Sequence, residues 1–177
     1  MDRNWDQDHL EDADLTRTVK QIHICAYINE NNEGDGEEPP TNHWATFLEI
    51  SSSHSVRLDM APGYGSDGLR GKIEISSKRY RLTNKAIHQL SFPIHGKPKV
   101  GDMIALINNH GLQKYQFTPE WEGCRFWIYS MISVLEQQGI VESGSASQTW
   151  EAVSYYYINP TGYQAREVKA GTFRSSA

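Results

Sequence analysis

The chain has 177 residues and a formal net charge of −5, and 38% of its residues are hydrophobic, with five tryptophans and nine tyrosines among them. This length and aromatic content predict one globular domain and exclude a wholly disordered chain. No apolar run reaches the roughly 18 residues of a membrane span, the N-terminus is polar and acidic, and there are two cysteines. We therefore expect a cytoplasmic protein without membrane contact, signal peptide or disulfide framework.

The negative charge is concentrated in two segments. Residues 1–14 contain six acids and one arginine, residues 30–38 contain five acids, and the rest of the chain carries a net charge of +5. We interpret 1–18 as an acidic N-terminal tail and 30–41 as an acidic loop, both solvated. The alternative is that they compete with an anionic ligand for a basic face. The single domain then spans 19–160, and 161–177 form a C-terminal tail.

Six basic residues and a single acid, Glu74, lie within residues 70–85. On neighbouring strands, these bases would form a patch that binds phosphate groups, which makes transfer RNA a candidate partner. The alternative is an ordinary solvated strand face. The candidate nucleic-acid residues are Arg70, Lys72, Lys78, Arg79, Arg81 and Lys85.

Apolar periodicity predicts strands first and helices later. Alternation and turn signals predict strands at 19–28, 43–50, 55–60, 71–76, 79–82, 87–94 and 114–117. Helical spacing predicts helices at 100–107, 123–138 and 148–158. Residues 43–60 form a hairpin closed at Ser51–His54. This order predicts an α+β domain: a mostly antiparallel sheet with helices packed on one side.

Cys124 stands at the start of the most regular predicted helix. Unpaired N–H groups and the partial positive charge of a helix N-terminus lower the pKa of a thiol, and Arg125 adds a positive neighbour. Gly123 would let a substrate approach the backbone closely, and the first-turn amides could bind an oxyanion. These features favour a nucleophilic cysteine. The alternative is a small packing residue.

The predicted hairpin limits which histidine can assist such a cysteine. If its turn centres near Ser52–Ser53, His43 and Asp59 share one polar face, where Asp59 would orient the imidazole as the third member of a triad. Glu49 and Arg57 lie on the same face, as a cross-strand pair or as a wall of the substrate pocket.

The remaining candidate chemistry is limited. Cys25 lies in an alternating strand, where we expect a structural role. The other histidines lack metal-ligand spacing, so no metal is expected. Since phosphate-loop and dinucleotide motifs are also absent from the sequence, we expect no cofactor. Four aromatic residues would line either the core or a ligand pocket: Trp44, Trp121, Phe126 and Trp127.

Three motifs together resemble a known family. Asn42-His43-Trp44, Ser55–Met60 and Gly123–Trp127 resemble, over residues 19–140, a large family of small fungal proteins of mostly unassigned function. At greater distance, the order of histidine and cysteine looks like the circularly permuted papain-like enzymes, including the lecithin retinol acyltransferase group. That resemblance implies a permuted papain-like fold with His43 as base, Asp59 in support and Cys124 as nucleophile.

A third, weaker resemblance is to fungal arginine-containing cyclodipeptide synthases. It implies that Cys124 accepts an aminoacyl group from transfer RNA as a thioester, which a second aminoacyl amine then attacks. Glu49, or another buried acid, would hold the guanidinium by paired hydrogen bonds.

Our hypothesis is therefore a Cys–His acyl-transfer enzyme of fungal specialised metabolism that acts on a small-molecule or aminoacyl substrate. Its most specific form makes arginine-containing cyclodipeptides. The alternatives are a thiol hydrolase (amidase, peptidase or thioesterase) and a non-catalytic binding module. The expected substrate-binding residues are Glu49, Arg57, Trp44, Gly123 and Arg125.

Overall fold

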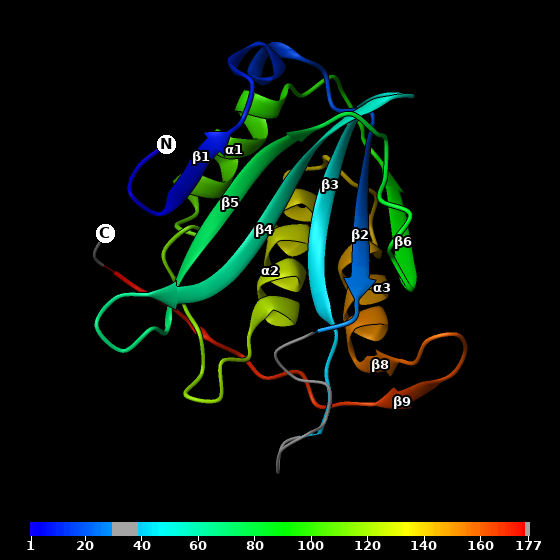
Figure 1. Cartoon of the computed structure of the whole chain (residues 1–177). Helices are drawn as coiled ribbons and strands as arrows, with labels where there is room; N and C mark the ends of the chain where they lie inside the picture. Colours follow the sequence, from blue (N-terminus) through cyan, green and yellow to red (C-terminus); the bar gives the residue numbers. More distant parts are fainter. Residues whose placement is uncertain (30–38, 176–177) are drawn as a thin grey trace.

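A curled, mostly antiparallel sheet forms one layer of the molecule, and the helices pack against one of its faces (Figure 1). The computed structural model describes residues 1–29 and 39–175. The main path of the sheet runs in the order β10-β7-β5-β4-β3-β2-β6, and β1 pairs with β5 beside this path. The predicted α+β class is confirmed.

The central strands follow from alternating side chains. They are β2 (Gln21–Tyr27), β3 (His43–Ser51), β4 (His54–Tyr64), β5 (Arg70–Lys78) and β6 (His88–Pro93). The predicted hairpin is present, since β3 pairs antiparallel with β4 and sets Phe47 opposite Arg57. The short strand β7 (Tyr115–Gln116) extends the sheet beyond β5.

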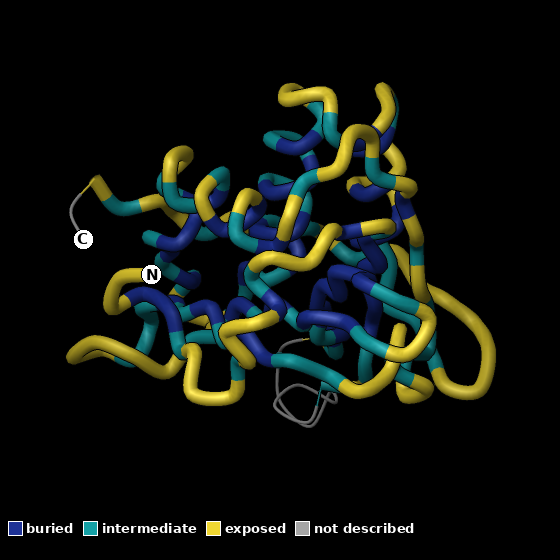
Figure 2. The backbone as a smooth tube through the Cα atoms, turned by 90° about the horizontal axis from the view of Figure 1, so that it is seen from above, coloured by how far each residue is buried: buried dark blue, intermediate teal, exposed yellow. Residues whose placement is uncertain are grey.

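Three helices cover the inner face of the sheet. They are α1 (Val100–Asn109), α2 (Cys124–Gln137) and α3 (Ser145–Val153). One apolar cluster fills the space between the layers, with Trp44, Leu58 and Ile73 from the sheet and Trp127 and Met131 from α2. Seen from above, the buried backbone runs through the middle of the molecule and the exposed segments lie at its rim (Figure 2).

The outer face of the sheet is partly covered by the segment after β5. Residues 79–82, predicted as a strand, form turns there instead. Tyr80 packs on Phe47 with ring centroids 6.0 Å apart, and its carbonyl oxygen accepts a hydrogen bond from Ser55. Phe47 is consequently buried, although alternation along β3 puts it on the same face as His43 and Glu49.

The N-terminal segment is not the solvated tail that the sequence predicted. β1 (Trp5–His9) pairs parallel with β5, and a 3-10 helix, η1, follows at Asp12–Thr16. The Trp5 side chain is buried and its indole N–H donates to Asn108 on α1 over 2.8 Å. Burial of this ring favours the packed position of the segment despite its many acidic residues.

The C-terminal segment also departs from the expected tail. The predicted helix at 148–158 ends earlier, because α3 stops at Val153 and is followed by β8 (Tyr155–Tyr157). β8 pairs with β9 (Tyr163–Ala165) in a separate hairpin, and β10 (Thr172–Phe173) pairs with β7. The chain thus returns to the main sheet only at β10.

Most of the expected acidic loop, residues 30–38, lies outside the described residues. No helix of the described part is long and apolar enough to cross a membrane.

The buried N-terminal strand yields a stability prediction. Trp5→Ala should lower the free energy of unfolding by about 3 kcal/mol, because it leaves a cavity between β1 and α1. Urea unfolding followed by circular dichroism measures this loss. Asp8→Asn, an exposed position on the same strand, is the control and should leave the midpoint unchanged. Equal stability of Trp5→Ala and the parent chain would contradict the packing of β1.

Candidate active site

Three side chains from distant parts of the chain meet at one end of the sheet. His43 begins β3, Asp59 lies on β4 and Cys124 begins α2. The His43 ring donates from Nε2 to Asp59 Oδ1 over 2.6 Å, and it forms a side-chain hydrogen bond with Cys124. Because Nε2 faces the carboxylate, Nδ1 is the ring nitrogen that remains for the sulfur. The three predicted catalytic residues are therefore brought together.

The way in which β3 and β4 separate explains this meeting point. Their ladder runs from Ser51 and His54 to Thr46 and Leu58, and no pair is assigned between the strands beyond it. The start of α2 lies where the ladder has ended, and the Trp44 backbone N–H forms a hydrogen bond with the Cys124 sulfur. In a longer ladder this N–H would donate to β4. Because the ladder ends before Trp44, the N–H is directed at the thiolate instead.

Asp59 is held in its charged form by two donors. One carboxylate oxygen accepts from His43, and the other accepts from Arg57 Nη2 over 3.2 Å. Burial alone would raise the pKa of Asp59, but the hydrogen bond from His43 and the charges of His43 and Arg57 outweigh burial and lower it. Arg57 also donates to Glu74 over 3.3 Å. Arg57, predicted to bind substrate, is placed to support Asp59.

The same balance favours a thiolate–imidazolium pair. Burial opposes protonation of His43, yet the hydrogen bonds and charges of Asp59 and Cys124 raise its pKa well above the ordinary value. Burial likewise raises the pKa of Cys124, but the hydrogen bond and charge of His43, with the Trp44 N–H and the charge of Arg125, lower it overall. Such a pair is a nucleophile with its proton donor already in place.

The start of α2 is fixed by a glycine packed against a tyrosine. Gly123 has a φ of +143°, and a Cβ at this position would lie 2.7 Å from the Tyr115 hydroxyl. That hydroxyl donates to the Gly123 carbonyl over 2.8 Å and accepts from the Gly171 N–H over 2.8 Å. Gly123 therefore serves the close approach of Tyr115, whose role no motif in the sequence indicates.

Arg125 is committed to the protein itself. Its buried guanidinium donates to the carbonyl oxygens of Val153 over 3.0 Å and Glu167 over 2.7 Å. Glu122 lies 3.7 Å away as an ion-pair partner. Arg125 thus joins α2 to α3 and the C-terminal segment, while its charge still helps to lower the pKa of Cys124. These contacts do not favour the predicted role in substrate binding.

Asn42 fixes the residue that precedes the histidine. Its side-chain amide donates to the carbonyl oxygens of Tyr27 and Tyr157, and its Oδ1 accepts from the Tyr157 N–H over 2.7 Å. The Asn-His-Trp motif contained this residue, but the partners lie too far away in sequence to be inferred from it.

A cavity of about 380 Å³ opens onto His43 and Cys124. Trp121 forms part of its wall and is 54% exposed. Its φ of +64° is the only positive value at a non-glycine residue in the described chain. Residues with strained backbone cluster at active sites and ligand clamps, which makes Trp121 a candidate ligand contact at the cavity.

Comparison with known proteins gives a family without an assigned activity. Residues 22–174 match a family model described as "Domain of unknown function (DUF7770)". The chain belongs to the DUF7770 family. No curated protein and no solved structure matches it. The resemblances to fungal enzymes and to permuted papain-like proteins therefore stay predictions, and the function of this DUF7770 protein has to be argued from its site.

Glu49 lies outside the cavity of this DUF7770 protein. It is six residues from His43 along β3, about 20 Å at the rise of a strand. Its carboxylate faces the buried His23 at 3.5 Å and Arg81 at 3.6 Å. The structure thus gives Glu49 a role in covering the outer face, and it does not bring the residue to the predicted substrate.

Four of the six basic residues have side-chain partners within the DUF7770 protein, and Arg81 is one of them through Glu49. Arg70 donates to Asn4 over 2.8 Å, and Lys72 lies over the Tyr64 ring. Arg79 pairs with Glu11 at 3.7 Å. Acidic residues of the N-terminal segment thus contact the stretch predicted to bind phosphates. In the described ranges, no group of three or more His, Cys, Asp or Glu side chains is arranged to hold a metal ion.

The two cysteines should differ sharply in reactivity. Burial raises the pKa of Cys25 to about 12, whereas that of Cys124 is lowered. Iodoacetamide should label Cys124 at neutral pH, with a rate that rises through a midpoint below the ordinary thiol pKa. His43→Gln should move this midpoint to higher pH, because burial of the thiol is then no longer offset by the imidazolium. Alkylation rates measured by mass spectrometry across the pH range test this.

Cys25→Ser is the matched control and should keep the parent profile. A Cys124 midpoint that stays in place in His43→Gln would show that the imidazole does not control the thiol.

Proposed function

We propose that this DUF7770 protein is a cysteine-dependent acyl-transfer enzyme. The observation that carries the proposal is the convergence of Cys124, His43 and Asp59 at the start of α2, beside an open cavity. A structural cysteine has no need of a charged imidazole partner, whereas a nucleophile needs both a lowered pKa and a group that moves a proton.

In the first step, the Cys124 thiolate forms a bond to the carbonyl carbon of the acyl donor. The bond to the leaving group then breaks, and the leaving heteroatom keeps the electron pair and takes the proton from the His43 imidazolium. The product is a thioester on Cys124. His43 is now neutral, and its ring stays oriented by Asp59 through the 2.6 Å hydrogen bond.

In the second step, an acceptor attacks the thioester carbonyl. An amine or hydroxyl gives transfer and water gives hydrolysis. His43 removes the acceptor's proton, the carbon–sulfur bond breaks, and Cys124 recovers its thiolate. The oxyanion formed in each step lies near the first turn of α2, whose N–H groups have no partner within the helix.

The donor and acceptor remain open. A thiol hydrolase would use the same residues, and a binding module would use none of them for chemistry. Transfer of an arginyl group from transfer RNA stays a prediction; the internal partners of Arg70, Arg79 and Arg81 offer it no support.

An activated ester tests the proposal directly. With p-nitrophenyl acetate, Cys124 should gain one acetyl group, seen by mass spectrometry of the intact chain and located by peptide mapping. His43→Gln should slow acylation by about 10²–10⁴-fold, the usual contribution of a positioned acid–base group. Addition of glycinamide then separates the two enzyme classes, because a transferase passes the acetyl group to the amine faster than to water.

Cys25→Ser should acylate like the parent chain, and Cys124→Ser should not form the thioester. If acetylation were spread over surface lysines and equal in Cys124→Ser, the protein would be a binding module and the proposal would fail.

The exposed ring at the cavity yields a separate prediction. Trp121→Ala should raise the KM of an aryl ester several-fold with a smaller change in kcat, because the ring binds the donor without touching the reacting atoms. Tyr163→Ala, at a ring more exposed than Trp121 and outside this cavity, is the control. Steady-state kinetics of the two variants measure these changes. A fall in kcat alone for Trp121→Ala would contradict a binding role.

A further inference from the structure

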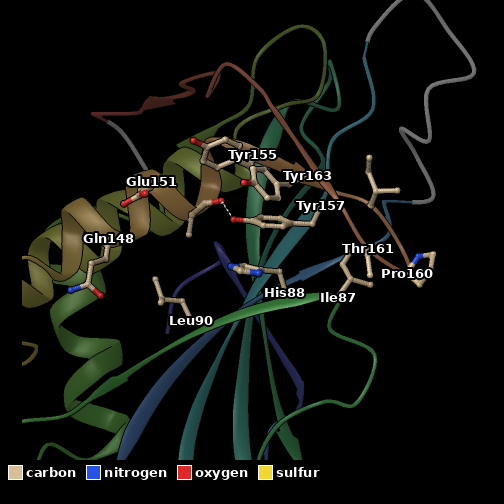
Figure 3. A pocket seen from close by; sticks show the side chains of 13 residues that line it. Ile87, His88, Leu90, Gln148, Glu151, Tyr155, Tyr157, Pro160, Thr161 and Tyr163 are labelled. Atoms are coloured by element: carbon tan, nitrogen blue, oxygen red, sulfur yellow. Dashed lines mark hydrogen bonds between the residues drawn. The ribbon is translucent and has the colours of Figure 1, made fainter.

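A second and larger cavity lies away from Cys124. It has a volume of about 670 Å³ and is formed by α3, the β8–β9 hairpin and the start of β6 (Figure 3). This volume falls in the range of sites for small molecules. None of the three proposed catalytic side chains lines it.

Aromatic rings form one wall of this cavity because of the register of the hairpin. Side chains alternate along a strand, so Tyr155 and Tyr157 share one face of β8. Tyr163 is paired with Tyr157 on the neighbouring strand, and its ring lies edge-on to Tyr155 at 5.3 Å. Tyr156 points to the opposite face, where Arg166 lies over its ring. Three tyrosines thus line the cavity and the fourth does not.

A histidine extends the aromatic wall. His88, at the start of β6, stacks on Tyr157 with ring centroids 3.9 Å apart and planes 5° from parallel. Contacts within the protein hold both rings in position. The Tyr157 hydroxyl donates to the Ala152 carbonyl, and the Trp44 ring packs edge-on to both Tyr157 and His88. Preorganised rings bind with a smaller entropy loss.

The charge at this cavity is negative. Glu151 on α3 contributes a carboxylate, and no lysine or arginine is among the lining residues of the described chain. The aromatic groups add no positive charge, since burial lowers the pKa of His88 and raises that of Tyr157 to about 12. Neutral ring faces beside a single carboxylate are complementary to a cation.

We propose that this cavity is a binding site for an organic ammonium ion, the alkylated nitrogen lying against the tyrosine rings and paired with Glu151. A rounded alkylammonium gains from contact with aromatic rings on several sides. An anionic ligand is disfavoured by the carboxylate. The site is separate from Cys124, so it does not rest on the proposed acyl transfer.

Choline is the probe that tests the site. Titration followed by NMR of aromatic side chains should give saturable shifts of Tyr157 and His88. Its uncharged isostere, 3,3-dimethylbutan-1-ol, should bind several-fold more weakly, since it lacks the charge that the rings and Glu151 attract. Glu151→Gln should weaken choline binding by about 2–5-fold, the range expected for loss of one solvent-exposed charge pair.

Variants within the hairpin make the test specific. Tyr163→Leu should weaken choline binding, whereas Tyr156→Phe, on the opposite face of β8, should bind like the parent chain. Cys124→Ser should also bind choline normally, which separates this site from acyl transfer. Equal affinity for choline and its isostere, no effect of Glu151→Gln, or no saturable shift would each overturn the proposal.

Discussion

The site depends on the separation of β3 from β4 before Thr46. Where β3 and β4 pair, every second side chain packs into the core. The paired strands leave no room between them for the start of a helix. Where pairing stops, the Trp44 N–H is directed at Cys124, and His43 still reaches Asp59 across the diverging strands. The position of the nucleophile is thus set by a backbone feature.

The segment after α3 helps to hold the start of α2 in position. Tyr115 and Gly171 hold the carbonyl before Cys124, and Arg125 bonds to the carbonyl oxygens of Val153 and Glu167. A buried guanidinium without such acceptors would be strongly destabilising. The helix start can therefore adopt its position only when the segment after α3 is folded against it, and the precision of the site is a property of the whole domain.

The sequence predicts what depends on local periodicity. His43 and Asp59 share a face because strand side chains repeat every two residues, and Cys124 begins a helix whose apolar spacing is regular. The position of Glu49 cannot be predicted in this way, because its partners, His23 and Arg81, come from other strands and loops. The acidic composition of β1 predicts solvated chain, whereas its pairing with β5 joins residues about seventy apart. The predictions for Glu49 and for β1 are wrong because both depend on contacts between residues far apart in the sequence.

The pairing of β1 also means that the folded domain includes residues outside the match to the family. The DUF7770 match begins at residue 22, after β1 and η1. Yet the Asn4 carbonyl accepts from the Ile73 N–H, and Trp5 covers the end of α1. A chain trimmed to the matched residues would leave one side of β5 as an open strand edge beside exposed apolar surface, the combination that promotes edge-to-edge association between copies. β1 thus covers a strand edge that would otherwise be open to pairing with another copy.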